Sequence, residues 1–222
     1  MHQTSKKRIA AKLWPRYSFT VEHLNYNARL FSWINKQSVP SFPSRFELYS
    51  YLAESLATIS YLEFGVWKGD SIRRWSALNH SPESRFFGFD SFEGLPEEWH
   101  HGRGGSTSTA HFNLSGDVPC FDDPRIIPVR GWFQRTMPDF LKSFERNGPM
   151  VINNDSDLYS STIYVLSKLD EIVLPGDLIV FDEFSSPANE FKAWTEYTNA
   201  FMRKTECIGM SNQWSQVAFR FL

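Results

Sequence analysis

Acidic residues stand at the ends of the apolar segments of this chain, where side chains from neighbouring strands could meet. Four apolar segments, YLEFGV, RFFGFD, MVINND and DLIVFDEF, end on or near them: Glu63, Asp90, Asp155 with Asp157, and Asp182 with Glu183. In an open parallel sheet, ligands bind outside the carboxyl ends of the strands, where the strand order reverses. Carboxylates gathered on that rim could accept a ligand's hydroxyl groups or take up a proton.

The loop after the first of these segments, FGVWKGDS at residues 64–71, does not match the common phosphate-binding patterns. Gly65 and Gly69 stand four residues apart, without the G-x-G-x-x-G spacing of dinucleotide-binding loops or the G-K-[ST] ending of a phosphate loop. These glycines are suited to a backbone that passes close beneath a ligand and then opens a helix. Asp70 is interpreted as the cap of that helix. The pattern therefore predicts a ligand that needs no phosphate groups.

Asp90 has two interpretations. A carboxylate at the tip of the second strand is where this topology accepts the two hydroxyls of an adenosine ribose. An acidic residue at a strand end is also often a helix cap or a turn former. We favour the ligand contact because of the motif around it, with Glu63 and Asp90 on either side of an adenosine-type ligand.

The elements that must position these residues alternate between strands and helices from residue 60 onward. Continuous apolar strands separated by helical patterns predict a doubly wound α/β fold with a mostly parallel sheet covered on both faces. The segments ECIGM and QVAFRFL, joined by a short connection, predict a C-terminal antiparallel hairpin at the edge of the sheet.

Two helices are predicted before the first strand, and together we expect them to lie across one end of the domain. One covers residues 20–38 with an apolar stripe at helical spacing: Val21, Leu24, Ala28, Phe31 and Ile34. The other begins at the capping box of Ser44 and Glu47 and runs to about residue 58. We expect residues 1–58 to form a helical lid or cap, and residues 59–222 to form the ligand-binding core of a single domain. Aromatic side chains of the lid are expected to supply a pocket for a bulky or planar ligand: Trp14, Tyr17, Tyr26, Phe31 and Trp33.

Composition and charge are those of an ordinary globular protein. The 222 residues, 41% hydrophobic and 22% charged, are enough for one full α/β core. The net charge of -2 gives no basic footprint for nucleic acid. Neither a signal-peptide core nor a membrane span is predicted, and Cys120 and Cys207 cannot build a disulfide framework. We therefore expect a cytoplasmic protein with no nucleic-acid or membrane partner.

Four stretches resemble the macrocin O-methyltransferase-like group of the class I S-adenosylmethionine-dependent methyltransferases. They occur in the family's order: YLEFGVWKGDS, FFGFDSFEGLPEEW, IIPVRGWFQRTMPDFL and DSDLYSSTIYVLSKLDEIVLPGDLIVFDEF. FDSFEGLP and DLYSST are the most specific, and the resemblance runs from about residue 44 to the end of the chain. It implies a Rossmann-like methyltransferase fold, S-adenosylmethionine as cofactor and a small-molecule acceptor.

The resemblance also implies roles for individual residues. Glu63 would hold the amino group of the methionine part of the cofactor, and Asp90 would bind the ribose hydroxyls. The other cofactor contacts that it implies lie along the methionine part or beside the adenine: Gly65, Gly69, Ser71, Ser91, Phe92, Gly131, Trp132, Phe133 and Asp155. For Trp132 and Phe133, a place in the hydrophobic core is the alternative.

Methyl transfer to a hydroxyl requires an aligned acceptor and the removal of its proton. Asp155 is the first choice of proton acceptor. The alternatives are His100, His101 and His111, in or just after the loop HHGRGGSTST, which we interpret either as a substrate-ordered lid or as disordered.

A divalent cation could activate the acceptor hydroxyl and fix its position. Metal-dependent members of the family carry acidic residues at the positions matched by Asp155, Asp182 and Glu183, so the resemblance implies a magnesium site there. The alternative is that Asp155 contacts the amino group of the cofactor and that the other two acids organise local turns.

The leading hypothesis is an O-methyltransferase that acts on a hydroxyl of a small molecule, such as a sugar or a natural product, with help from a metal ion. An N-methyltransferase without metal, or a non-catalytic cofactor-binding or scaffold protein, are the alternatives. Three carboxylates side by side on the rim argue against a scaffold, because an idle site has no need for them. A homodimer is the candidate assembly.

Overall fold

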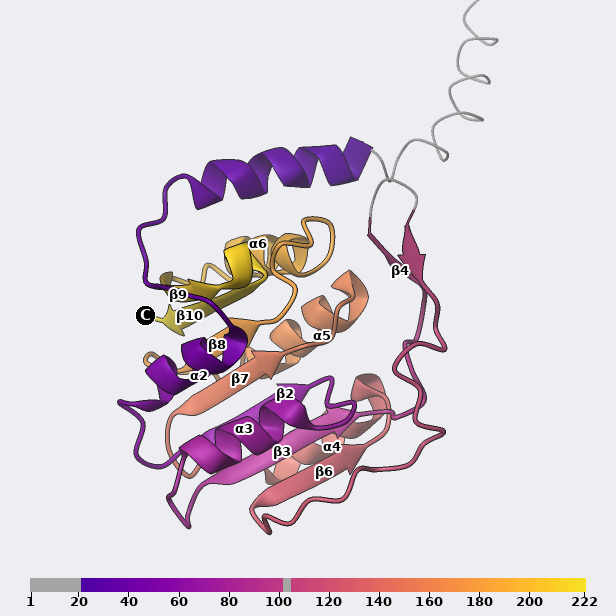
Figure 1. Cartoon of the computed structure of the whole chain (residues 1–222), viewed down its shortest axis with the longest axis vertical. Helices are drawn as coiled ribbons and strands as arrows, with labels where there is room; N and C mark the ends of the chain where they lie inside the picture. Colours follow the sequence, from indigo (N-terminus) through magenta and orange to yellow (C-terminus); the bar gives the residue numbers. More distant parts are fainter. Residues whose placement is uncertain (1–20, 102–104) are drawn as a thin grey trace, which may run out of the picture.

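Five adjacent parallel strands form one side of an eight-stranded mixed sheet in the computed structural model, which describes residues 21–101 and 105–222 (Figure 1). The parallel strands are β2 (Ser60–Phe64), β3 (Arg85–Asp90), β6 (Ile126–Arg130), β7 (Met150–Asn154) and β8 (Leu178–Phe181). The sheet order is β1-β9-β10-β8-β7-β2-β3-β6, so the strand order reverses between β2 and β7. That reversal confirms the predicted doubly wound fold and places the switch point between Glu63 and Asp155.

The predicted C-terminal hairpin is also present. Strands β9 (Thr205–Ser211) and β10 (Gln216–Phe221) pair antiparallel, and β10 pairs antiparallel with β8. A two-residue strand that was not predicted, β1 (Ser41–Phe42), adds to the edge of β9. Because β10 pairs antiparallel with β8, Gln216 at the start of β10 lies next to Asp182, which follows the end of β8.

Helices cover both faces of the sheet because the central strands are apolar on both sides. Every residue of β2, β7 and β8 is buried, and successive residues point into different clusters: Leu62 and Phe64 into one, Tyr61 into the other. The first cluster lies under three helices: α4 (Phe133–Ser143), α5 (Tyr159–Leu169) and α6 (Glu190–Ala200). The second lies under two: α2 (Arg45–Ala53) and α3 (Asp70–Leu78).

The helix that precedes β1 spans residues 21–34 in the described part of the chain, and of its predicted core stripe only Ile34 packs against the core. Tyr26 and Leu30 are the buried residues, and Trp33 packs beside them, 5.2 Å from the Phe184 ring between ring centroids. Phe31 of the predicted stripe is 62% exposed, and Val21 and Leu24 are exposed with it. Both stripes have helical spacing, so the spacing alone could not select between them.

The two N-terminal helices do not lie together across one end of the domain. Residues 21–34 pack on the face of α6 and β10 (Figure 1, indigo), whereas α2 packs on the opposite face with α3. Helix α2 ends at Ala53 rather than near residue 58, although its capping box is present. Trp14 and Tyr17 lie outside the described residues, and the division at residue 58 stays a prediction.

The long connection between β3 and β6 contains a small antiparallel pair of strands, β4 (Trp99–His100) and β5 (Ser106–Thr107). The amide of Asn189 donates a hydrogen bond to the main-chain carbonyl of His100, at 3.2 Å, so this hairpin is docked at the start of α6. The rest of the predicted lid, residues 102–104, lies outside the described part. Within that part, no helix is long and apolar enough to span a bilayer.

Candidate active site

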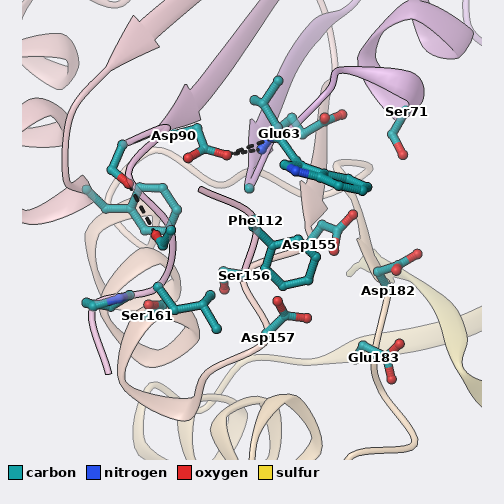
Figure 2. Close-up of a pocket in the computed structure, with 18 of the residues that line it drawn as sticks. Glu63, Ser71, Asp90, Phe112, Asp155, Ser156, Asp157, Ser161, Asp182 and Glu183 are labelled. Carbon is teal, nitrogen blue, oxygen red and sulfur yellow. Dashed lines mark hydrogen bonds between the residues drawn. The ribbon is translucent and has the colours of Figure 1, made fainter. Parts of the chain in front are cut away.

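A cavity opens at the carboxyl ends of β2, β3, β7 and β8, where the sequence predicts a ligand (Figure 2). It brings together most of the predicted site residues: Glu63, Gly65, Gly69, Ser71, Asp90, Ser91, Trp132, Phe133, Asp155, Asp182 and Glu183. Parallel strands end on the same edge of the sheet, so residues far apart in the sequence meet there.

Phe92 and Gly131, two of the predicted cofactor contacts, do not line the cavity. The Phe92 ring is fully buried in the core cluster under α2 and α3, and its main-chain N–H donates to Asp90 Oδ1 at 2.7 Å. Gly131 donates its N–H to the main-chain carbonyl of Asp90 at 2.8 Å. Both residues therefore shape the turns beside Asp90, and the Phe92 ring packs in the hydrophobic core instead of lining the cavity.

Trp132 and Phe133 line the cavity at the start of α4, with Trp132 at the N-cap position. The Phe133 ring also packs edge-on against Phe64, with 5.5 Å between the ring centroids. The contact with the ligand and the place in the core, which were posed as alternatives, are thus both compatible with the position of Phe133.

Glu63 is a buried carboxylic acid at the floor of the cavity, with 1% of its surface exposed. Its Oε2 accepts hydrogen bonds from the Tyr61 hydroxyl and from the Asn153 amide. Burial raises the pKa of Glu63 to about 8, although the Tyr61 hydroxyl and the Arg45 charge act in the other direction. A cationic group placed beside this carboxyl would favour its ionised form and lower its pKa, so the position suits a ligand that carries a positive charge.

Asp90 organises the loops at the end of β3. Its Oδ2 accepts the main-chain N–H groups of Val66 and Trp67, both at 2.8 Å (Figure 2), and its Oδ1 accepts that of Phe92. The turn-forming role that the sequence left open is therefore present. The same carboxylate lines the cavity, and its role toward a ribose stays a prediction.

Gly65 is required by the close approach of two loops. Its φ is +93°, in the left-handed region, and a Cβ atom there would lie 1.8 Å from the main-chain oxygen of Asp155. Only glycine lets the loop after β2 pass this close to the end of β7. Gly69, with φ +84°, is the N-cap of α3, so Asp70 is the first helical residue and not the cap that the sequence suggested.

Four carboxylates gather on the side of the cavity formed by the ends of β7 and β8 (Figure 2): Asp155, Asp157, Asp182 and Glu183. Burial raises the pKa of Asp155, and the neighbouring carboxylates of Asp182 and Asp157 raise it further. Burial also raises the pKa of Asp157, next to Glu183. The pKa of Glu183 is raised to about 7, again chiefly by burial. This half of the cavity is rich in carboxyl groups, and their raised pKa values mean that they bind protons more tightly than ordinary Asp and Glu side chains do.

Arg45, the first residue of α2, reaches into this acidic group and was missed in the sequence. Its Nη1 lies 3.1 Å from Asp182 Oδ1 and 3.8 Å from Asp155 Oδ2. The Gln216 amide donates to the same Asp182 oxygen at 3.2 Å. The capping box beside Arg45 was read from the sequence as the start of a helix, and no local pattern indicated that this residue meets acids more than one hundred positions later.

Asp157 was placed on the rim by the sequence but was given no role in the predicted site. It is 6% exposed, lines the cavity and has φ +60°, a left-handed conformation that Asp adopts more readily than most residues. The Asp-Ser-Asp spacing is visible in the sequence. In a continuing strand, Asp155 and Asp157 would point to the same face, but the strand does not continue this far. It ends at Asn154, and the turn brings Asp157 into the cavity.

The predicted magnesium site does not fit this arrangement. Across residues 21–101 and 105–222, no three His, Cys, Asp or Glu side chains are grouped so as to hold a metal ion. Asp182 is already held by Arg45 and Gln216, and the Arg45 charge stands between Asp182 and Asp155. A guanidinium in that position opposes the approach of a divalent cation, which would need oxygen atoms from both acids.

The predicted aromatic pocket is wrong for the three of its residues that the structure describes, while Trp14 and Tyr17 lie outside the described residues. Tyr26 and Trp33 pack in the core, and Phe31 is exposed on the outside. Among the cavity-lining residues that the structure describes, the aromatic walls come from the loops after β2 and β3 and from the start of α4: Trp67, Trp99, Phe112, Trp132 and Phe133. His100, His101 and His111, the alternative proton acceptors, do not line the cavity as described.

Comparison with known proteins places these features in a family. The family model of the macrocin O-methyltransferases matches residues 58–220. The 8-demethyl-8-(2,3-dimethoxy-alpha-L-rhamnosyl)-tetracenomycin-C 4'-O-methyltransferase of Streptomyces olivaceus is 29% identical over 147 residues, which are 57% of this chain and 53% of that protein. The chain thus spans about half the length of this curated relative.

Solved structures of methyltransferases share the fold. The O-methyltransferase NovP superimposes with a TM-score of 0.62 at 22% identity, over 79% of this chain and 78% of that one. The calicheamicin methyltransferase CalS11 gives 0.60 at 20% identity, over 98% and 92% of the two chains. The methyltransferase PaMTH1 of Podospora anserina, solved with S-adenosylhomocysteine bound, gives 0.51 at 13% identity, over 100% and 97%. Because the family model matches residues 58–220, which are well over half of the chain, this protein belongs to the macrocin O-methyltransferase family.

Proposed function

We propose that the protein is an S-adenosylmethionine-dependent O-methyltransferase that methylates a hydroxyl group of a small molecule, with a sugar or a glycosylated natural product as the acceptor class. One observation carries the proposal: a single cavity at the topological switch point joins the buried Glu63 to a group of high-pKa carboxylates. An amino-acid-bearing cofactor fits the first feature, and a hydroxyl that must lose a proton fits the second.

The cofactor half of the cavity is formed by the ends of β2 and β3 and the first residues that follow them. Glu63 would bind the ammonium group and Asp90 the ribose hydroxyls, and Gly65, which also lines the cavity, would lie along the methionine part. Ser91 and Trp132 lie where the loops after β3 and β6 enclose the remaining space, suited to the adenine. When bound, S-adenosylmethionine supplies a methyl group that is already activated for transfer.

The acceptor half provides the base. Asp155 is our candidate for the proton acceptor, because it lines the cavity at the switch point and its raised pKa makes its ionised form a stronger base than an ordinary aspartate. Asp157 shares this property and lies two residues away, so it is the second candidate. Magnesium assistance, which the family resemblance implies, is left out of the proposal because the carboxylates do not fit it.

Relatives indicate the acceptor class. The tetracenomycin methyltransferase is named for a rhamnosyl substrate, and one CalS11 structure is described as a TDP-rhamnose 3'-O-methyltransferase. The aromatic side chains of Trp67, Trp99 and Phe112 at the cavity offer flat apolar surfaces, which suit the apolar face of a sugar ring. A cytoplasmic location and a homodimer stay predictions.

The experiment is a transfer assay with methyl-labelled S-adenosylmethionine against rhamnosylated natural products and nucleotide-linked sugars. We expect labelled product with the methyl group on a sugar oxygen, located by mass spectrometry and NMR. Asp155→Asn should abolish transfer while S-adenosylhomocysteine still binds, and Asp157→Asn should show whether the neighbouring acid carries the proton instead. A methyl group on nitrogen would support the N-methyltransferase alternative, and failure to bind S-adenosylhomocysteine would refute the proposal.

A further inference from the structure

Arg45 occupies a position that its own helix does not explain. It is the first residue of α2, and a cation in the first turn is disfavoured by the helix macrodipole. Its guanidinium nevertheless points away to the cavity, with Nη1 at 3.1 Å from Asp182 and 3.8 Å from Asp155. The side chain is 30% exposed, so two acids and a partly buried cation share one region of low dielectric. The guanidinium also lies over the ring of the neighbouring Phe46, 5.4 Å from its centroid, but its charged contacts are the two carboxylates.

Asp182 is held from two sides. Its Oδ1 accepts from Arg45 and from the Gln216 amide, and the same amide also donates to the main-chain oxygen of Asp182 at 3.0 Å. Gln216 is itself fixed, because the Ser211 hydroxyl donates to its Oε1 at 3.0 Å. Both side-chain donors act on Oδ1, so a metal ion that took this oxygen would have to displace two charge-assisted hydrogen bonds.

We propose that Arg45 is the built-in counter-cation of Asp155 and Asp182, and that methyl transfer by this protein therefore proceeds without a divalent cation. In this role Arg45 is a positioning residue: it holds Asp155 at the edge of the acceptor half and compensates the charge that a metal ion would otherwise compensate. This inference rests on the proposed function for the part that concerns turnover. The part that concerns cation binding does not depend on any acceptor being found.

The first test measures metal binding without turnover. Mn²⁺ is titrated into the full-length protein, and the free ion is followed by electron paramagnetic resonance. We expect negligible binding by the wild type and binding at least about tenfold tighter by Arg45→Ala, because two carboxylates then lack their cation. Adding Asp182→Asn to Arg45→Ala should remove the gain.

Arg74→Ala is the matched control, because it removes the same charge from a surface arginine that hydrogen-bonds Ser50 outside the cavity. It should bind no more Mn²⁺ than the wild type. A wild type that binds one Mn²⁺ as tightly as Arg45→Ala, with the binding lost in Asp182→Asn, would overturn the proposal.

The second test concerns turnover of an acceptor found with the labelled-cofactor assay. Wild-type kcat should be the same in excess EDTA and in added Mg²⁺. Arg45→Ala should lower kcat about tenfold or more with little change in cofactor affinity, and Arg45→Lys should restore part of kcat because it keeps the charge. Loss of wild-type activity in EDTA and its recovery with Mg²⁺ would refute the inference, while the O-methyltransferase assignment would stand. Failure to turn over any acceptor would instead count against the assignment, and the Mn²⁺ titration would still decide the role of Arg45.

Discussion

The buried acid Glu63 should make cofactor binding depend on pH. In the ligand-free protein its pKa is raised to about 8, mainly by burial, so at neutral pH most molecules carry it protonated. The ammonium group of the cofactor favours the ionised carboxylate. Binding at low pH therefore requires the loss of a proton, and the apparent affinity falls by the fraction of molecules that are still protonated.

The size of the effect follows from that pKa. If only the ionised form of Glu63 binds the ammonium group, the affinity is reduced about 100-fold at pH 6, about tenfold at pH 7 and about twofold at pH 8. The net rise between pH 6 and pH 8 is then about 50-fold, with a slope near one proton per molecule below pH 7.

The assay is calorimetric titration of S-adenosylhomocysteine between pH 6 and pH 8, in buffers with different ionisation enthalpies so that the released proton is counted. Glu63→Gln is the control, since glutamine keeps the shape and cannot ionise. Other high-pKa acids in the cavity, such as Glu183, titrate in the same range, so the difference between the two proteins isolates Glu63. Equal pH dependence in the wild type and in Glu63→Gln would refute this reasoning.

Three further predictions concern the stability of the fold and the affinity for the cofactor product. Gly65→Ala should destabilise the fold by at least about 4 kcal/mol, because its Cβ would meet a main-chain oxygen. Gly176→Ala, with the same left-handed φ and nothing within 4 Å, should cost only about 1–2 kcal/mol in urea denaturation, and equal losses would contradict the steric argument. Leu30→Ala should cost about 2–5 kcal/mol in the same assay, whereas exposed Phe31→Ala should be nearly neutral; the reverse result would restore the stripe predicted from the sequence. Asp90→Ala should weaken S-adenosylhomocysteine binding about 10- to 100-fold by calorimetry, since a ribose would lose a charged acceptor, and unchanged affinity would leave Asp90 with its loop contacts alone.

Features that depend on local pattern could be predicted from the sequence. Strands buried on both faces are continuous apolar runs, and a run that ends in an acid places that acid at the rim of the sheet whatever the rest of the chain does. Glu63, Asp90 and Asp155 were found in this way, and so was the C-terminal hairpin. The glycine pattern of the loop after β2 excluded phosphate-binding motifs for the same local reason.

Contacts between distant segments were decided only by the tertiary structure. Arg45 and Asp182 are 137 residues apart, so nothing in the helix that contains Arg45 indicates the acid that it meets. Gln216 reaches the same acid because β10 inserts beside β8. For residues 21–34, two apolar stripes had the same helical spacing, and the side that could bury Tyr26 and Leu30 against α6 and the sheet became the core face. The sequence therefore places carboxylates on the rim, but the residue that neutralises them depends on which segments the fold brings next to them.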